Sequence, residues 1–229
     1  MNYEKNDILT ITIEDMSSEG EGIGKKDGFT IFVKDAVIGD VVEAKIVKMK
    51  PNYAYARLEK VISPSHFRTE PACKFCRQCG GCQIQALSYE KQLELKQKKI
   101  FNNLVRIGGF GRNILESVME PILGMDDPYH YRNKAQYPVG TGKNGDIITG
   151  FYAGRTHSII HNTDCALGVE TNRKILETTL AYMRENGIKA YDEKTGEGLI
   201  RHILIRTGFD SKEIMVCLVV NQEPNKNGT

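Results

Sequence analysis

The run Cys73-Lys74-Phe75-Cys76-Arg77-Gln78-Cys79-Gly80-Gly81-Cys82 holds four of the chain's six cysteines within ten residues. Two residues separate each of these cysteines from the next, so their thiolates can converge on one metal centre if the loop is tight. The two glycines provide the backbone freedom that such a loop needs. This cysteine loop, residues 73–82, is the feature around which we expect the rest of the chain to be organised.

Composition limits what the loop can be. A chain of 229 residues can form one large or two small domains and bury a core without disulfides. It has no apolar segment after a basic start and no apolar run of membrane-spanning length, so we expect a cytoplasmic protein without a signal peptide or membrane association. In that compartment a tight cysteine cluster favours a metal site over disulfides.

Two metal centres fit the loop on spacing. Zinc sites usually take paired cysteines from two separate knuckles, whereas here a single run holds all the local cysteines. Consecutive C-x-x-C spacing is typical of iron–sulfur proteins. Spacing therefore favours an iron–sulfur centre, with zinc as the alternative.

The first sixty residues show the alternation of apolar and polar residues that half-buried strands have. Alternating runs start at Ile8, Phe29, Val42 and Tyr53, and Gly20, Gly22 and Gly24 are expected to form a turn between the first two. Several short strands separated by glycine turns indicate a small β-barrel.

One face of the last two predicted strands combines basic and aromatic residues. Such a face suits an RNA backbone and stacked bases, although on spacing alone an ordinary solvated barrel exterior is the commoner explanation of this composition. Because the net charge is only +2, RNA binding has to rest on a local surface of this kind. The candidate RNA contacts are Lys48, Lys50, Tyr53, Tyr55 and Arg57.

The glycine and turn pattern of this region resembles the TRAM domain. The matching features run from Gly20-x-Gly22-x-Gly24 through Ala36-x-x-Gly39-Asp40 to Tyr53-x-x-Ala56. The resemblance implies a five-stranded, OB-like, RNA-binding barrel of the kind attached to RNA-modifying enzymes. We therefore expect residues 1–63 to form an RNA-binding β-barrel and residues 64–229 to form a second domain.

The sequence pattern of the second domain predicts an α+β fold. Ser88 is a predicted N-cap for a helix that runs to about Ile107, and Val169–Asn186 is a second predicted helix. Predicted strands surround the second helix without βαβ regularity. The apolar run Ile214–Val220 predicts a buried strand, which would make Cys217 a core residue and not a nucleophile.

The cysteine loop and the residues that follow it resemble RNA (uracil-5-)-methyltransferases of the RumA type, the ribosomal-RNA branch. The matching residues include Cys79-Gly80-Gly81-Cys82-Gln83, Ser88-Tyr89 and a later stretch that ends at Cys165. In that family three loop cysteines and one distant cysteine hold a [4Fe–4S] cluster. The resemblance implies the ligands Cys73, Cys79, Cys82 and Cys165, with Cys76 as an alternative to Cys73.

The same resemblance implies a function. The expected activity of the parent protein is S-adenosylmethionine-dependent formation of 5-methyluridine in 23S ribosomal RNA by a monomer, with the cluster in a structural role. Four further basic residues match the family's central domain, although ordinary strand-surface charge would explain them as well. These candidate RNA contacts are Arg132, Lys134, Arg201 and Arg206.

Family members also carry a Rossmann-like domain that binds S-adenosylmethionine and supplies the catalytic residues. No Gly-x-Gly loop here follows a strand and opens a helix. The expected fold class is therefore a TRAM barrel followed by a truncated α+β domain, with the methyltransferase domain absent, the polar run 221–229 at the end and no catalytic residue in this chain. On this expectation the chain is the N-terminal half of the enzyme and is inactive alone.

Two other functions remain open. One is a stand-alone RNA-binding iron–sulfur module without catalysis. The other is a radical S-adenosylmethionine methylthiotransferase, a class that can also carry a TRAM-like barrel. Its C-x3-C-x2-C signature does not occur in this sequence.

Overall fold

The computed structural model describes residues 3–222, and residues 223–229 of the polar C-terminal run lie outside the described residues. Contacts divide the chain into two compact units. Unit 1 contains the residues up to 72 and residues 82–125, and unit 2 contains residues 73–81 and those from 126 onward. The two units are described separately below.

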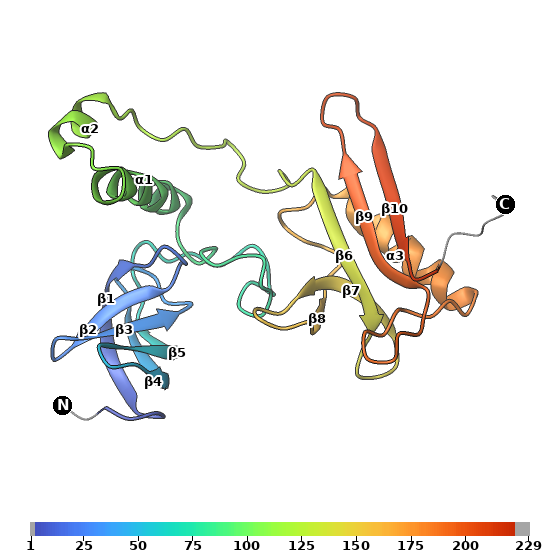
Figure 1. Ribbon diagram of the computed structural model, residues 1–229, viewed down its shortest axis with the longest axis horizontal. Helices are drawn as coiled ribbons and strands as arrows, with labels where there is room; N and C mark the ends of the chain where they lie inside the picture. Colours follow the sequence, from blue (N-terminus) through green and yellow to red (C-terminus); the bar gives the residue numbers. More distant parts are fainter. Residues whose placement is uncertain (1–2, 223–229) are drawn as a thin grey trace. The chain divides into compact units, whose positions relative to one another are not determined.

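Unit 1 contains a closed β-barrel in which the strand order is β1-β2-β3-β5-β4 (Figure 1). Its strands are β1 (Ile8–Met16), β2 (Gly22–Lys26), β3 (Phe29–Lys34), β4 (Val41–Met49) and β5 (Tyr53–Ser63). β3 and β5 are parallel, and the other neighbours are antiparallel. The inward-facing residues of the alternating runs fill the barrel, with Ile31, Val42 and Ala44 fully buried.

The glycine segment was expected to be a turn, but most of it is the strand β2. A Cβ at Gly24 would lie 2.3 Å from Cγ2 of Ile11, and one at Gly22 would lie 2.9 Å from Cγ2 of Ile13. These two glycines therefore allow β2 to lie tightly against β1. Only Gly20, with φ of +85°, has a turn conformation that favours glycine.

Two helices follow the barrel in unit 1, α1 (Tyr89–Arg106) and α2 (Arg112–Val118). The prediction for the first was correct in position, since the Ser88 hydroxyl accepts a hydrogen bond from the Lys91 N–H at the start of α1. The apolar positions of α1 do not form a buried stripe, because Ile100 is 51% exposed, and Ile107, just after the helix, is 83% exposed.

Residues 82–125 were expected to belong to the second domain, but their contacts place them with the barrel. Leu87 is fully buried against Met16 and Val37, and Leu95 of α1 packs against the same cluster. The Lys98 ammonium also forms an ion pair with Asp15 of β1 at 2.8 Å. Apolar burial and charge both join α1 to the end of β1.

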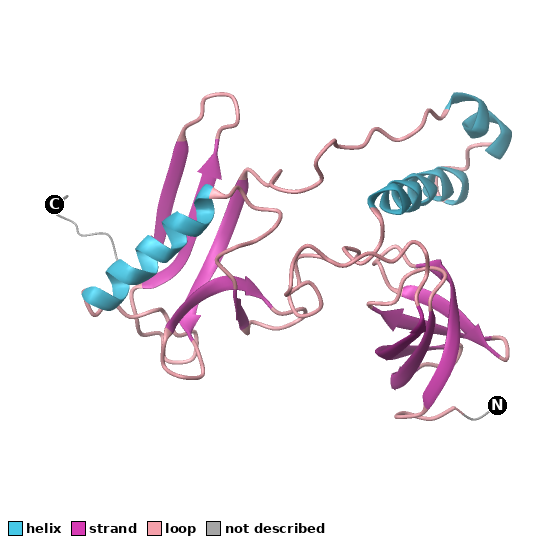
Figure 2. Ribbon diagram, turned by 180° about the vertical axis from the view of Figure 1, so that it is seen from behind, coloured by secondary structure: helices cyan, strands magenta, loops and turns pink. Residues whose placement is uncertain are grey.

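Unit 2 is a five-stranded sheet covered on one face by the helix α3 (Thr171–Glu185), as Figure 2 shows from the helix side. The sheet order is β10-β9-β6-β7-β8. Its strands are β6 (Lys134–Thr141), β7 (Ile147–Tyr152), β8 (Ile159–His161), β9 (Ile200–Thr207) and β10 (Ile214–Val220).

The core of unit 2 lies between α3 and the sheet. Leu176, Leu180 and Met183 of α3 are buried against Tyr137 of β6 and Ile203 of β9. The helix ends before Gly187, whose φ of +63° fits a glycine at that position.

β10 contradicts the expectation of a buried strand. Within residues 3–222 it pairs only with β9, and Val216 and Leu218 are 44% and 45% exposed. Cys217 is therefore exposed and is not a core residue. An uninterrupted apolar run identifies a strand, but it does not reveal whether another element covers that strand.

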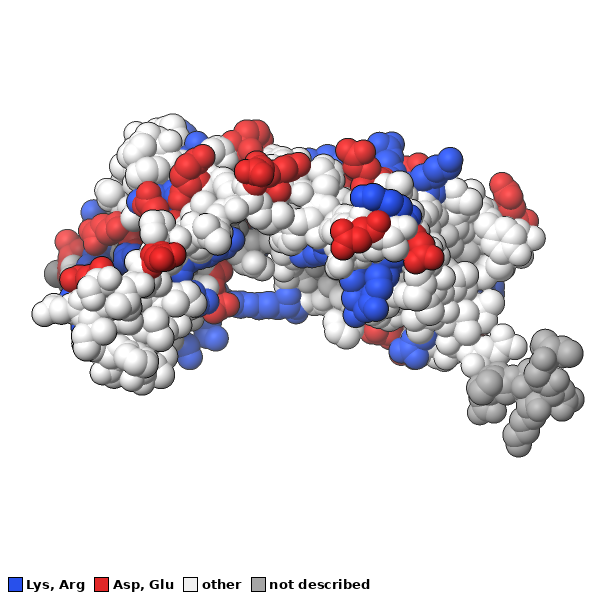
Figure 3. All heavy atoms as spheres, turned by 90° about the horizontal axis from the view of Figure 1, so that it is seen from above, with Lys and Arg blue, Asp and Glu red and all other residues white. Residues whose placement is uncertain are grey.

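Charge and hydropathy add two observations. Figure 3 shows Lys and Arg side chains interspersed with Asp and Glu side chains on the face in view, in keeping with the small net charge. Among the described residues, no helix combines the length and the apolar composition needed to cross a membrane.

Candidate functional site

Residues 79 and 80 of the cysteine loop are attached to the end of β7 within unit 2. The Gly80 N–H donates to the Tyr152 carbonyl at 3.0 Å, and Cys79 forms an isolated β-bridge with Ala153. A Cβ at Gly80 would lie 3.2 Å from the Cα of Gly154, so the loop and the turn after β7 are in close contact. Glycine at position 80 therefore permits this docking.

Cys165 lies in the segment between β8 and α3, where its carbonyl accepts a hydrogen bond from the Gly168 N–H at 2.8 Å. Burial raises the pKa of the Cys79 thiol, and the nearby Cys165 and Cys73 raise that pKa further, whereas the hydrogen bond from the Gly81 N–H and the charge of Arg132 oppose the shift. Cys79 therefore lies within electrostatic range of two other predicted ligands, Cys73 and Cys165, and of one predicted RNA contact, Arg132.

The thiols do not form a finished metal site. Within residues 3–222, no group of three or more His, Cys, Asp or Glu side chains has an arrangement that could hold a metal ion. By its contacts Cys82 belongs to unit 1, where its sulfur accepts a hydrogen bond from the Gln85 side-chain amide at 3.1 Å. The iron–sulfur assignment therefore stays a prediction.

Cys76 lies in a tight turn at the start of the loop. Its N–H donates to the Cys73 carbonyl at 3.0 Å, and the Cys79 N–H donates to the Phe75 carbonyl at 2.8 Å. This turn fixes the backbone of all three cysteines, and Cys76, like Cys73, is half-buried. The structure gives no reason to exchange Cys73 for Cys76 as a predicted ligand.

A second candidate surface lies on the outside of the barrel, where three aromatic rings form a cluster. The Tyr53 and Tyr55 rings lie 5.6 Å apart in an edge-to-face arrangement, and the Phe32 ring lies 5.5 Å from Tyr53 and 5.6 Å from Tyr55. We call Phe32, Tyr53 and Tyr55 the ring cluster. Sequence reasoning missed Phe32 as a member, because the parallel register that places Phe32 opposite Tyr55 cannot be read from alternation.

Basic residues border the ring cluster. Lys48 lies opposite Tyr55 across β4 and β5, and the Lys50 N–H donates to the Tyr53 carbonyl at 2.9 Å. Arg57 lies between Lys34 on β3 and Lys45 on β4, two lysines that sequence reasoning also missed. The Arg57 guanidinium pairs with Glu59 at 2.7 Å, but this pair is largely exposed and is readily exchanged for another anion.

The four basic candidates of unit 2 fall on different parts of its sheet. Lys134 and Arg206 are direct cross-strand partners on β6 and β9, and both are exposed. Arg132 lies just before β6, where its N–H donates to the Leu167 carbonyl at 2.9 Å. Arg201 lies at the other end of β9, with its guanidinium 4.3 Å from the centre of the Tyr191 ring. The predicted contacts therefore form a pair and two separate positions.

Comparison with known proteins connects these surfaces to a class. Residues 4–58, which contain most of the barrel, match the family described as the TRAM domain. A protein from Clostridium acetobutylicum and one from Clostridium tetani, each named an uncharacterized RNA methyltransferase, are 43% and 41% identical to this chain, and each match covers 96% of it. The chain is thus related, through both units, to proteins named RNA methyltransferases.

A solved structure extends the likeness to the fold. The tRNA (uracil-54, C5)-methyltransferase of Pyrococcus abyssi, in complex with S-adenosyl-L-homocysteine, superimposes with a TM-score of 0.66 and 24% identity. The superposition covers 94% of this chain and 46% of that protein. The chain spans about half the length of the curated relatives it matches, 47% and 46% for the two clostridial proteins.

The expected fold class was a barrel and an α+β domain that do not belong to a methyltransferase fold. These comparisons show that this expectation was wrong. Alignment over 96% of the chain with RNA methyltransferases, and superposition of 94% of it on a solved methyltransferase, show that both units are parts of such a fold. The expectation relied on a missing glycine-rich loop, and the absence of one motif does not define a fold. Neither comparison supports describing the chain as inactive alone.

Proposed function

We propose that this chain binds RNA and acts in S-adenosylmethionine-dependent RNA methylation. The names of the relatives support the reaction class, and their similarity extends over both units. The match of residues 4–58 to the TRAM domain supports RNA as the partner.

The ring cluster with its basic border is the observation that carries the RNA proposal. Aromatic rings on a barrel exterior give unstacked bases a surface to stack on, and flanking cations attract the phosphates between those bases. Phe32 and Tyr55 lie opposite each other on β3 and β5, while Lys48 lies opposite Tyr55 on β4. The surface therefore offers base contacts and phosphate contacts at neighbouring positions of three adjacent strands.

The proposed product is 5-methyluridine in 23S ribosomal RNA. The likeness of the cysteine loop to the ribosomal-RNA branch supports that choice, whereas the Pyrococcus abyssi protein is named for a transfer RNA and shares only its fold with this chain. Methyl transfer from labelled S-adenosylmethionine to transcripts of the two RNAs, followed by nucleoside analysis, distinguishes these substrates. Labelled 5-methyluridine in transfer RNA alone would refute the ribosomal assignment.

The proposal includes a [4Fe–4S] cluster held by Cys73, Cys79, Cys82 and Cys165. Thiolates are the donors that such clusters use. Three of the four cysteines are near one another in unit 2, and the fourth follows Cys79 by three residues along the chain. When bound, the cluster would cross-link the cysteine loop to the segment that contains Cys165, a structural role without electron transfer.

RNA binding by the barrel is tested by fluorescence anisotropy with a labelled single-stranded fragment over a salt series. We expect Tyr53→Ala to weaken binding by about 1 to 3 kcal/mol while the salt dependence is unchanged, because it removes a stacking partner. Lys48→Ala should lower the slope of log K against log salt by about 0.7, because it removes one phosphate contact. Lys174→Ala, an exposed lysine on α3, is the matched control.

Two results would contradict the proposal. If the unmodified chain does not bind RNA even at low salt, the RNA-binding function is wrong. If Lys174→Ala changes binding as much as Lys48→Ala does, binding depends on overall charge and the barrel surface has no special part in it.

A further inference from the structure

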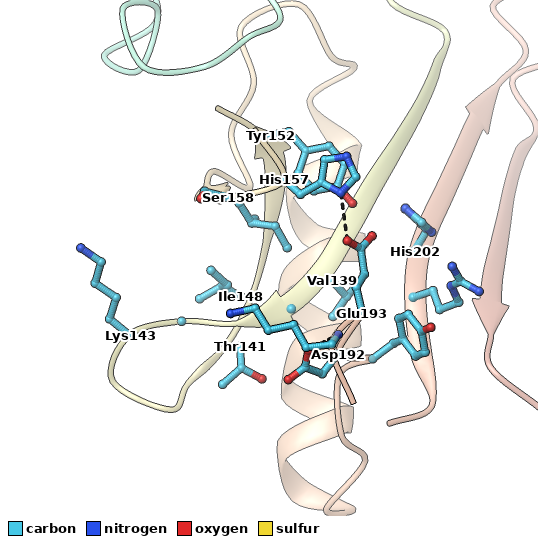
Figure 4. A pocket seen from close by; sticks show the side chains of 16 residues that line it. Val139, Thr141, Lys143, Ile148, Tyr152, His157, Ser158, Asp192, Glu193 and His202 are labelled. Atoms are coloured by element: carbon cyan, nitrogen blue, oxygen red, sulfur yellow. Dashed lines mark hydrogen bonds and ion pairs between the residues drawn. The ribbon is translucent and has the colours of Figure 1, made fainter. Parts of the chain in front are cut away.

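Unit 2 contains a cavity that has no role in the functions above, although Arg201 at its rim is one of the predicted RNA contacts (Figure 4). It has a volume of about 550 Å³ and lies between the β6–β7 hairpin, the segment 157–159, the loop 191–194 and the start of β9. This volume is within the usual range for sites that hold a small molecule or a single group of a larger ligand. Val139, Ile148 and Ile159 give the cavity an apolar part.

One wall of the cavity is an aromatic pair. The Tyr152 and His157 rings are stacked, with their centres 5.1 Å apart and their planes 23° apart. Nδ1 of His157 is 2.9 Å from a carboxylate oxygen of Glu193, and this contact fixes the orientation of the imidazole, as Figure 4 shows. The His157 side chain is nevertheless 75% exposed, so a further planar group can reach it.

A buried nitrogen on β9 lacks a hydrogen-bond partner. Among the described residues, Nδ1 of His202 is buried and makes no hydrogen bond. Burial lowers the pKa of His202 and the charge of Arg201 lowers it further, while Glu193 opposes the shift, so the neutral imidazole is favoured. A buried polar atom without a partner is destabilising, and a ligand that supplied a hydrogen bond would remove that penalty.

The charges at the rim identify the kind of ligand. Arg201, held over the Tyr191 ring at 4.3 Å, and Lys143 and Lys194 are cationic, whereas Asp192 and Glu193 are anionic. This mixture is unsuited to a free anion such as phosphate. It suits a planar, hydrogen-bonding ring attached to a phosphate, with the ring on the aromatic pair and the phosphate near a rim cation.

We propose that this cavity binds one unstacked base of a single-stranded RNA segment, with the base against Tyr152 and His157 and its polar edge toward His202. The assignment rests on the proposed RNA-binding function and adds a second base-binding position to the ring cluster of unit 1. The aromatic pair also borders a shallow hollow lined by Gly80, Gly81 and Arg155. RNA held at the pair would therefore pass close to residues 80 and 81, in the part of the cysteine loop that belongs to unit 2.

The test uses the whole chain and single-stranded RNA that carries 4-thiouridine, with affinity measured by anisotropy and contacts mapped by photocrosslinking. We expect His157→Ala to weaken binding about tenfold, because it removes one stacking surface. His202→Phe keeps a ring of similar size but removes the buried nitrogen, and it should also weaken binding. His161→Ala is the matched control, since His161 is another exposed histidine of unit 2 that does not line the cavity.

The measurements distinguish a wrong cavity assignment from a wrong RNA-binding function. Crosslinks to residues 152–159 or 191–202 that disappear in His157→Ala would support the cavity assignment. If RNA binds, but both variants bind it like the control and crosslinks fall only on the barrel, the cavity assignment is wrong and the proposed function stands. If the unmodified chain binds no RNA, the proposed function is wrong and the cavity assignment falls with it.

Discussion

Arg68 forms a bidentate ion pair with Asp40, a residue that is completely buried. The guanidinium Nη2 lies 2.6 Å from Oδ2 of Asp40, and Nε lies 3.0 Å from Oδ1. The carboxylate also accepts hydrogen bonds from the N–H groups of Val37 and Ser65, at 2.8 and 3.0 Å. This pair ties the turn before β4 to the segment that leaves the barrel.

Arg68→Ala should therefore destabilise unit 1. Removing one partner of a buried pair leaves the other charge uncompensated, so we expect a loss of about 3 kcal/mol in the free energy of unfolding, measured by urea denaturation. Arg57→Ala is the control, because its ion pair with Glu59 is exposed and should contribute less than about 1 kcal/mol. Equal losses in the two variants would show that the Asp40 carboxylate is satisfied without Arg68.

Cys165→Ala should lose the proposed cluster. We expect about four iron and four sulfide per chain after anaerobic purification of the unmodified protein, and a large loss of both in Cys165→Ala. Cys217→Ala should keep the full content, because Cys217 is exposed on β10. Stoichiometric zinc, or an unaffected Cys165→Ala variant, would rule out the proposed ligand set.

Tyr137 should make stability fall at alkaline pH. Burial raises the pKa of Tyr137 from 10.0 to about 12, so the folded state holds a proton that the unfolded state releases above about pH 10. The contribution of the protonated Tyr137 to the free energy of unfolding is complete below pH 10 and is lost as the pH approaches 12. It amounts to about 2 to 3 kcal/mol.

Urea unfolding of Tyr137→Phe provides the comparison. The variant also removes the acceptor for the Asn172 amide, which donates to the Tyr137 hydroxyl at 3.1 Å, so it should be less stable at neutral pH. The difference in stability between the variant and the unmodified protein should shrink between about pH 10 and about pH 12. A difference in stability that stays constant over this range would show that the pKa of Tyr137 is the same in the folded and unfolded states.

Cys217 should be the first cysteine to react with a thiol reagent under native conditions. It is exposed, whereas the other five cysteines are half-buried, and access limits alkylation. Mass spectrometry of the briefly alkylated protein should find the label on the peptide that contains Cys217. Labelling of this peptide only after urea is added would mean that β10 is covered in solution.

Sequence patterns correctly predicted the helices that depend on interactions between neighbouring residues of the chain. Ser88 caps α1 with its own hydroxyl, and the spacing of Leu176, Leu180 and Met183 defines the buried face of α3 without knowledge of its partner. The glycines of β2 misled the prediction because their role is close contact with β1, which lies outside their own segment.

Properties that depend on distant residues could not be predicted from the pattern. The register that brings Phe32 to Tyr55 is a parallel pairing between strands that are separated along the chain by β4. The proximity of Cys165 to Cys79 was expected only through the family resemblance, and nothing in their spacing indicates it. The cavity beside His202 combines four separate segments, and only the start of β9, with Arg201, was singled out from the sequence.

The position of β10 at the end of its sheet has a consequence for how the protein behaves at high concentration. The barrel of unit 1 is closed, so its main-chain groups pair within the barrel and leave no open edge. β10 instead presents an open edge together with exposed apolar side chains such as Val216 and Leu218. Among the described strands, the seven-residue β10 therefore combines an edge position with exposed apolar side chains, which favours strand-to-strand self-association.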